Sequence, residues 1–215
     1  MEYKIKRSKR KTIAFRILNE NQILILCPIC ISDKELKKII DENQEMIQKQ
    51  FKKYQRNHLS IDESKLLYHG KEYSYKILRG THNQVEIIND TIHITCTYSY
   101  SYMEVYERFL EKDVYQNSLQ YVEKYSKLLK RKEMPLVEVK HVKSKWGSCT
   151  YRKNKVMFNT VLGMLPLMYL EEIVCHLLCH FLHPNHSKEF HELLELLFPN
   201  HRKVERELKK YGSLL

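Results

Sequence analysis

The sequence predicts an α+β protein of 215 residues, with antiparallel strands and a helix in its N-terminal part and mainly helices in its C-terminal part. Two observations predict this class. Across residues 1–100, short runs alternate between polar and apolar side chains, which is typical of strands with one buried face. Beyond residue 101, apolar residues recur every three or four positions, as in amphipathic helices. We therefore divide the chain into an N-terminal α+β region (1–100), a connecting helix (101–132) and a C-terminal domain (133–215).

The first elements that the sequence predicts are three strands and a helix. Residues 2–7 and 11–18 are expected to form a hairpin around a polar turn, and residues 22–27 to form a third strand. Ser32 is the expected N-cap of a helix that extends to about Arg56. The candidate core residues of this helix recur at helical spacing and are Leu36, Ile39, Ile40, Ile47 and Phe51.

Turn signals divide residues 66–97 into further antiparallel strands. These signals are the pairs His69-Gly70, Arg79-Gly80 and Asn89-Asp90. A long helix is predicted to follow, over about residues 103–132. Its candidate core residues are Val105, Phe109, Leu110, Leu119 and Leu128.

The C-terminal domain begins where Met134-Pro135 ends the long helix. Residues 136–143 and 155–159 alternate as two strands, and the segment Lys143-Ser-Lys-Trp-Gly-Ser-Cys149 lies between them without a predicted structure. Three helices are expected after the strands. They run from about Pro166 to His183, from near Ser187 onward, and from about His201 to Tyr211.

The net charge of +11 is concentrated near the N-terminus. Residues 1–57 hold 14 lysines and arginines against 7 acidic residues. Lys9, Arg10 and Lys11 lie in the densest part, and a basic field of this kind could bind nucleic acid. The alternative interpretation is a solvated basic hairpin without a partner.

The composition indicates a cytoplasmic protein that does not enter a membrane. No apolar run reaches the ~18 residues of a membrane span, and the N-terminus lacks a signal-peptide core. The six cysteines are expected to be free thiols. Cys27 and Cys30 have the spacing of a redox or zinc pair, but no second pair accompanies them, so structural packing is the favoured interpretation.

Three histidines near the C-terminus have the spacing of a metal site. His176 and His180 are four residues apart and project from one face of a helix. His186 follows the helix-ending Pro184 and can return to complete the set. Three imidazoles that leave a fourth position open are typical of catalytic zinc. His183, and after it Cys179, are the alternatives to His186 as third ligand.

The residue after the first histidine is inconsistent with an efficient zinc protease. Such an enzyme has glutamate there, as the general base that deprotonates the attacking water. This chain has Leu177, which cannot accept a proton. Glu189 and Glu172 are weak candidates for a replacement base, and Glu171 or Glu172 could hydrogen-bond to a ligand imidazole.

The motifs together resemble the YgjP-like metallopeptidases, which are zincins related to the SprT-like and WLM groups. The resemblance is strongest over 143–190, and an opening segment at Arg7–Ile13 and a strand at Leu67–Tyr73 extend it over nearly the whole chain. It implies a zincin-like C-terminal domain in which His176, His180 and His186 hold zinc and a glutamate at position 177 acts as the general base. Leu177 departs from that pattern, and His191 stands where the family often carries tryptophan.

We therefore expect a zinc-binding metallopeptidase-family protein that is catalytically impaired and acts as a pseudoenzyme or peptide-binding module. Its expected partner is a peptide or unfolded protein. Loss of a general base typically lowers a rate by about 10²–10⁴-fold, while zinc alone still activates a carbonyl. The alternatives are an active zinc-dependent peptidase that uses another base, and a nucleic-acid-associated protein that uses the basic N-terminal hairpin.

Overall fold

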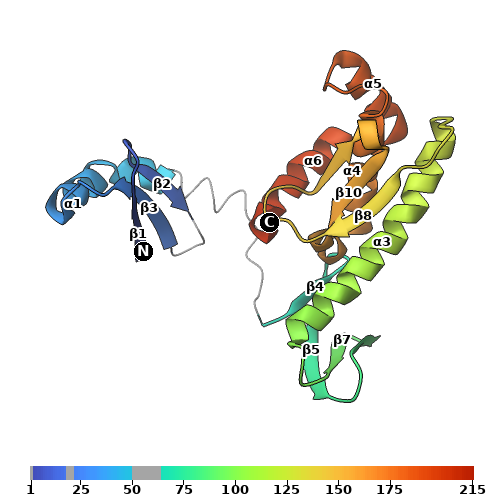
Figure 1. Cartoon of the computed structure of the whole chain (residues 1–215), viewed down its shortest axis with the longest axis horizontal. Helices are drawn as coiled ribbons and strands as arrows, with labels where there is room; N and C mark the ends of the chain where they lie inside the picture. The colour runs from blue at the N-terminus through green and yellow to red at the C-terminus, as the bar shows by residue number, and fades with distance from the viewer. Residues whose placement is uncertain (1, 18–21, 50–63) are drawn as a thin grey trace. The chain divides into compact units, whose positions relative to one another are not determined.

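A computed structural model describes residues 2–17, 22–49 and 64–215, and its helices and strands confirm the α+β class (Figure 1). Contacts group the chain into two units. One comprises Met1–Ser60 with Lys209–Ser213, and the other comprises Ile61–Leu208 with Leu214–Leu215. The three-part division made from the sequence remains a prediction.

In the N-terminal unit, β3 (Gln22–Pro28) lies at the centre of a three-stranded sheet. β1 (Glu2–Ser8) runs parallel to β3 on one side, and β2 (Ala14–Ile17) runs antiparallel to it on the other. The predicted hairpin of the first two strands is therefore wrong, because each of them pairs with β3 and only β2 is antiparallel to it. The apolar strand β3 takes the position flanked on both sides, while the charged strand β1 forms an edge, where lysines oppose aggregation.

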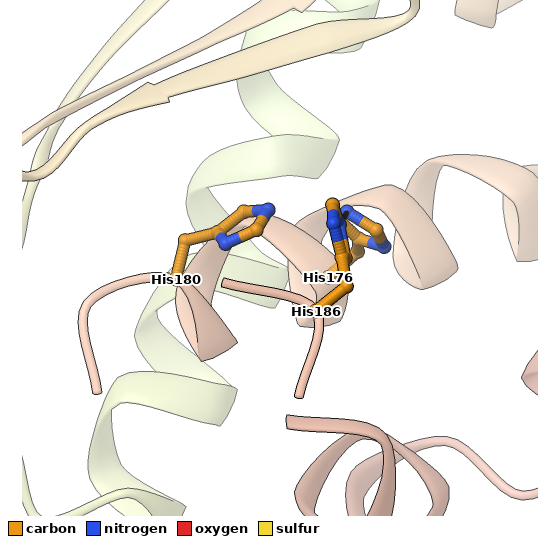
Figure 2. Close-up of side chains that lie close together, drawn as sticks. All are labelled: His176, His180 and His186. Carbon is orange, nitrogen blue, oxygen red and sulfur yellow. Dashed lines mark hydrogen bonds between the residues drawn. The ribbon is translucent and has the colours of Figure 1, made fainter. Parts of the chain in front are cut away.

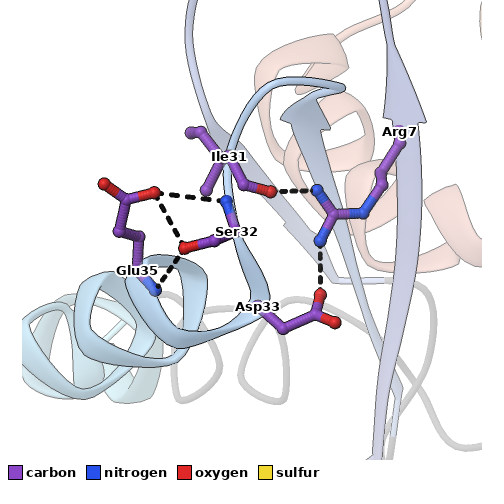
Figure 3. Close-up of polar contacts among 5 residues, drawn as sticks. All are labelled: Arg7, Ile31, Ser32, Asp33 and Glu35. Carbon is purple, nitrogen blue, oxygen red and sulfur yellow. Dashed lines mark hydrogen bonds and ion pairs between the residues drawn. The ribbon is translucent and has the colours of Figure 1, made fainter.

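Helix α1 (Asp33–Glu42) begins at the predicted N-cap. The Ser32 hydroxyl accepts a hydrogen bond from the Glu35 backbone, and the Glu35 carboxylate accepts one from the Ser32 backbone (Figure 3). Arg7 donates to the Ile31 carbonyl and to Asp33, which ties the end of β1 to the start of the helix. α1 ends at Glu42 and residues 44–49 form a second helical segment, while Phe51 and the predicted helix end near Arg56 lie outside the described residues.

The core of this unit consists of apolar side chains from β3 and the helical segments. The buried members are Ile23, Ile25, Cys27, Leu36 and Ile47. Ile39 and Ile40, which were also predicted core residues, are half-buried. Cys27 therefore has the packing role that its position indicated, and Cys30 is an exposed free thiol.

The second unit opens with a four-stranded sheet in the order β4-β5-β7-β6. Its strands are β4 (Leu66–Tyr68), β5 (Lys71–Arg79), β6 (Gln84–Ile88) and β7 (Thr91–Cys96). β4–β5 and β6–β7 are antiparallel, as predicted, whereas β5 and β7 are parallel. β7 buries Ile92, Ile94 and Cys96 completely, and this apolar strand again lies between two less buried ones.

Helix α3 (Tyr102–Leu128) packs along both sheets of the second unit (Figure 1). Ser101 and Glu104 form a capping box at its start. Val105 and Leu110 are buried against the first sheet, whereas Leu128 is 61% exposed and is not the core residue that its spacing predicted. Among the described helices, none is long and apolar enough to cross a membrane.

The second sheet of this unit has the order β8-β10-β9. β10 (Lys155–Asn159) pairs in parallel with β8 (Leu136–Lys140) and antiparallel with β9 (Gly147–Thr150). The sequence did not predict β9, because four residues that include glycine and serine carry little alternation. The helices are α4 (Leu167–Cys179), α5 (Lys188–Leu197) and α6 (His201–Leu208), with 3₁₀ turns at Tyr151–Lys153, Thr160–Met164 and Lys209–Leu214.

The turn between β4 and β5 anchors the segment that leads into α4. The backbone N–H of His69 donates to Gly163, and that of Gly70 donates to Met164, at 3.0 and 2.9 Å. Gly70 has a φ of +82°, and a Cβ there would lie 2.4 Å from Cγ of Pro166. Glycine is thus required both by the left-handed backbone and by the close approach.

Candidate metal centre

His176 and His180 project from the last turns of α4, and His186 returns to them from the connection to α5 (Figure 2). One ligand atom from each ring lies within 4.8 Å of the others, and the Nε2 atoms of His176 and His186 are 3.1 Å apart. The helical spacing brings the first two rings together, and Pro184 with Asn185 turns the chain back for the third. The set is close enough to share one metal ion after small ring rotations.

Two contacts orient the histidine rings. Nδ1 of His180 donates a hydrogen bond to the His183 carbonyl at 3.3 Å, which leaves Nε2 with its lone pair for a metal. The fully buried Phe190 lies against all three imidazoles, with ring centroids 4.7–5.1 Å apart. Phe190 is held there by α5, whose N-cap Ser187 accepts a hydrogen bond from the Phe190 backbone.

Burial keeps the first two histidines neutral. Burial first, and then the neighbouring His180 and His186, lower the pKa of His176 to about 4. Burial likewise lowers the pKa of His180. Neutral imidazole is the form that binds metals, so His176 and His180 need no deprotonation to bind a metal at pH 7.

The two alternative third ligands have other environments. His183 contributes its backbone carbonyl to His180. Cys179 is fully buried, and burial raises the pKa of its thiol to about 12, which disfavours the thiolate that binds zinc. The group of three that the structure brings together contains His186, the first choice from the sequence.

Leu177 lies beneath the edge strand β9. Its side chain is only 5% exposed, and a Cβ added at Gly147 would lie 3.0 Å from Leu177 Cδ1. The same Cβ would lie 2.8 Å from the Met157 carbonyl oxygen. An apolar group therefore fills the space between α4 and β9 next to Gly147.

Asn159 organises the loop before β9, and sequence reasoning did not select this residue. This residue is fully buried, and its side-chain amide donates to the carbonyls of Val142 and Lys145 at 2.6 and 2.9 Å. Its backbone N–H donates to Trp146 at 2.8 Å. The position of Gly147 over α4 depends on these bonds. The Trp146-Gly147 pair within a polar segment was the signal available in the sequence.

The candidate replacement bases occupy different environments. Glu189 is exposed on the first turn of α5, and the Ser187 hydroxyl donates to its carboxylate at 2.6 Å, which lowers its pKa. Glu172 is 1% exposed, and burial, followed by the charge of Glu205, raises its pKa to about 7. Glu171 accepts hydrogen bonds from Lys124 and Tyr125 of α3, both at 2.7 Å, so it fixes α3 to α4.

The basic candidates lie in the N-terminal unit. Lys9 and Lys11 are exposed in the connection between β1 and β2, and the Arg10 backbone donates to Ser8 at 2.8 Å. They lie at a polar turn, as expected. This turn connects the two edge strands of the sheet, which do not pair with each other as the strands of a hairpin would.

Comparison with known proteins identifies one family. The model of the YgjP-like metallopeptidase domain matches residues 11–211. Among solved structures, the crystal structure of the metallopeptidase zymogen of Methanocaldococcus jannaschii jannalysin is similar at 26% identity, over 46% of this chain and 97% of that chain, with a TM-score of 0.40. A search of curated proteins finds no match.

Proposed function

Because the chain belongs to the YgjP-like metallopeptidase family, we propose that it binds zinc and peptides but hydrolyses peptides poorly. The observation that carries this proposal is the buried Leu177 beside His176, His180 and His186. The three histidines retain the geometry of a metal site, while the adjacent position holds an alkyl group that cannot move a proton.

The three imidazoles fit the metal that the family implies, which is typically zinc. Their converging nitrogen atoms and the orientation of His180 by the His183 carbonyl support this assignment. Zinc bound there would polarise a peptide carbonyl and acidify the attacking water. Because Leu177 stands where the family has glutamate, no general base at that position would deprotonate the water.

Strand β9 supports the peptide-binding part of the proposal. It is the edge of the order β8-β10-β9, and it lies on α4, the helix that carries His176. An extended peptide can add to such an edge through backbone hydrogen bonds.

An active peptidase with another base has less support. The hydrogen bond that lowers the pKa of Glu189 makes it a weaker base. Glu172 has a suitable pKa of about 7, but it is buried among the thiols of Cys175 and Cys179, whose pKa values its charge raises.

The first test is the zinc content of the purified protein, measured by elemental analysis for the wild type, His180→Ala and His183→Ala. His180→Ala should lose one zinc per chain relative to the wild type, because it removes one of three ligands. His183→Ala is the matched control and should lose none, because a backbone carbonyl orients His180. Equal zinc in His180→Ala and the wild type would contradict the proposed site.

A second candidate function is binding of nucleic acid through the N-terminal unit. Residues 2–17 contain seven lysines and arginines and one acidic residue, Glu2. Replacing Lys9, Arg10 and Lys11 with glutamine should weaken duplex DNA binding and reduce its salt slope by up to about 0.9 per lost phosphate contact. The control replaces the exposed Lys34, Lys37 and Lys38 of α1. Identical binding by both triple variants and the wild type would exclude this function for the basic turn.

A further inference from the structure

A second group of metal-ligating side chains lies where α5 turns into α6. His191 and Glu195 are four residues apart on α5, so they share one face of that helix. His201 is the first residue of α6 and faces them across the turn. Imidazole and carboxylate groups at this spacing are common zinc ligands.

One distance within this group fits a shared ion. Nε2 of His201 lies 3.5 Å from Oε2 of Glu195, which is too long for a good hydrogen bond. Ligand bonds of 2.0–2.2 Å at a tetrahedral zinc separate a nitrogen from an oxygen by roughly 3.4 Å. The rings of His191 and His201 have centroids 5.7 Å apart, compared with 4.8–5.1 Å among His176, His180 and His186. The second group is thus looser than the first, which alone among the described residues has all three ligand atoms within 4.8 Å of one another.

Two of the nitrogen atoms in this group are buried without a hydrogen-bond partner. They are Nδ1 of His191 and Nε2 of His201, and the His201 side chain is only 2% exposed. Buried imidazole nitrogens without partners are uncommon in folded proteins and call for a specific explanation. Glu195 is already positioned, because its Oε1 accepts a hydrogen bond from the Asn200 backbone at 3.1 Å and its Oε2 faces His201.

We propose that His191, Glu195 and His201 bind a second zinc ion, which fastens α5 to α6. The carboxylate is 55% exposed and gives the ion a route from solvent, while His201 provides a ligand from the interior. Binding would draw the looser group together. Because α5 begins directly after His186 and carries Phe190, a metal at this corner stabilises the framework of the histidine site.

The test is a titration of metal-free protein with zinc against a competing chelator. The variants are His191→Phe, His180→Ala and their combination, because phenylalanine keeps an aromatic ring against His201 and removes the donor nitrogens. We expect two zinc ions per chain for the wild type, one for each single variant and none for the double variant. Cobalt(II) bound to His180→Ala should give the visible absorption of a tetrahedral site, and His191→Phe should remove the part of the wild-type spectrum that His180→Ala retains.

Glu195→Gln is an independent test, since this exposed position tolerates substitution and the glutamine side chain can still accept the hydrogen bond from the Asn200 backbone. It should weaken the second zinc at least tenfold and leave the first unchanged. If the wild type binds one zinc that His180→Ala loses and His191→Phe retains, the proposal is overturned and the two rings serve only as packing. That outcome leaves the His176 site intact, so the two assignments fail separately.

Discussion

Replacing Leu177 with glutamate should raise zinc-dependent cleavage of unfolded protein by about 10²–10⁴-fold, the usual contribution of general acid–base assistance. The carboxylate would stand between α4 and β9, next to the three histidines, where Leu177 now packs under Gly147. A bound cation would stabilise the ionised carboxylate, which burial alone would disfavour. The measurement is the initial rate of cleavage of a fluorescent unfolded substrate, with and without a chelator.

Leu177→Gln is the matched control for this experiment. Glutamine has nearly the size and polarity of glutamate but cannot accept the proton, so this variant should cleave no faster than the wild type. Zinc content and far-ultraviolet circular dichroism establish that both variants fold and hold metal. A folded, zinc-loaded Leu177→Glu protein with the wild-type rate would mean that the missing base does not limit catalysis.

Replacing Glu172 with glutamine should stabilise the protein in a pH-dependent way. Burial raises the pKa of this carboxyl from 4.5 to about 7, and Glu205 adds to the effect. An acid whose pKa is raised on folding binds its proton more tightly in the folded state. The contribution of this proton to the free energy of unfolding is fully present below pH 4.5, declines as the pH rises toward 7, and is absent above it. The shift corresponds to about 3 kcal/mol, so Glu172→Gln should gain roughly that free energy of unfolding over the wild type between pH 4.5 and 8.

The measurement is urea-induced unfolding of metal-free protein at pH 5 and pH 8, with the wild type and the variant side by side. Using metal-free protein at both pH values separates this effect from loss of zinc in acid. Glu205→Gln provides a second arm, because it removes the lesser cause of the shift and should recover only part of the gain. If the free energy of unfolding differs between Glu172→Gln and the wild type by the same amount at both pH values, the pKa of Glu172 is not raised on folding.

The sequence by itself determined the features that depend on near neighbours in the chain. Ser32 could be identified as an N-cap because its partner Glu35 is three residues away. The strand Lys155–Asn159 and the helix after Ser187 have periodicities that few residues suffice to define. His176 and His180 belong together for the same reason, since four residues make one helical turn.

Only the tertiary structure decided which distant segments lie together. β3 and β7 occupy central positions because an apolar strand between two neighbours removes more apolar surface from water than the same strand at an edge. The order of strands along the chain does not indicate which strand takes that position. The closeness of His186 to His176 and His180, the burial of Leu177 under Gly147 and the meeting of His191 with His201 all depend on contacts across turns. Such contacts are set by the packing of whole elements, and no local pattern of residues encodes them.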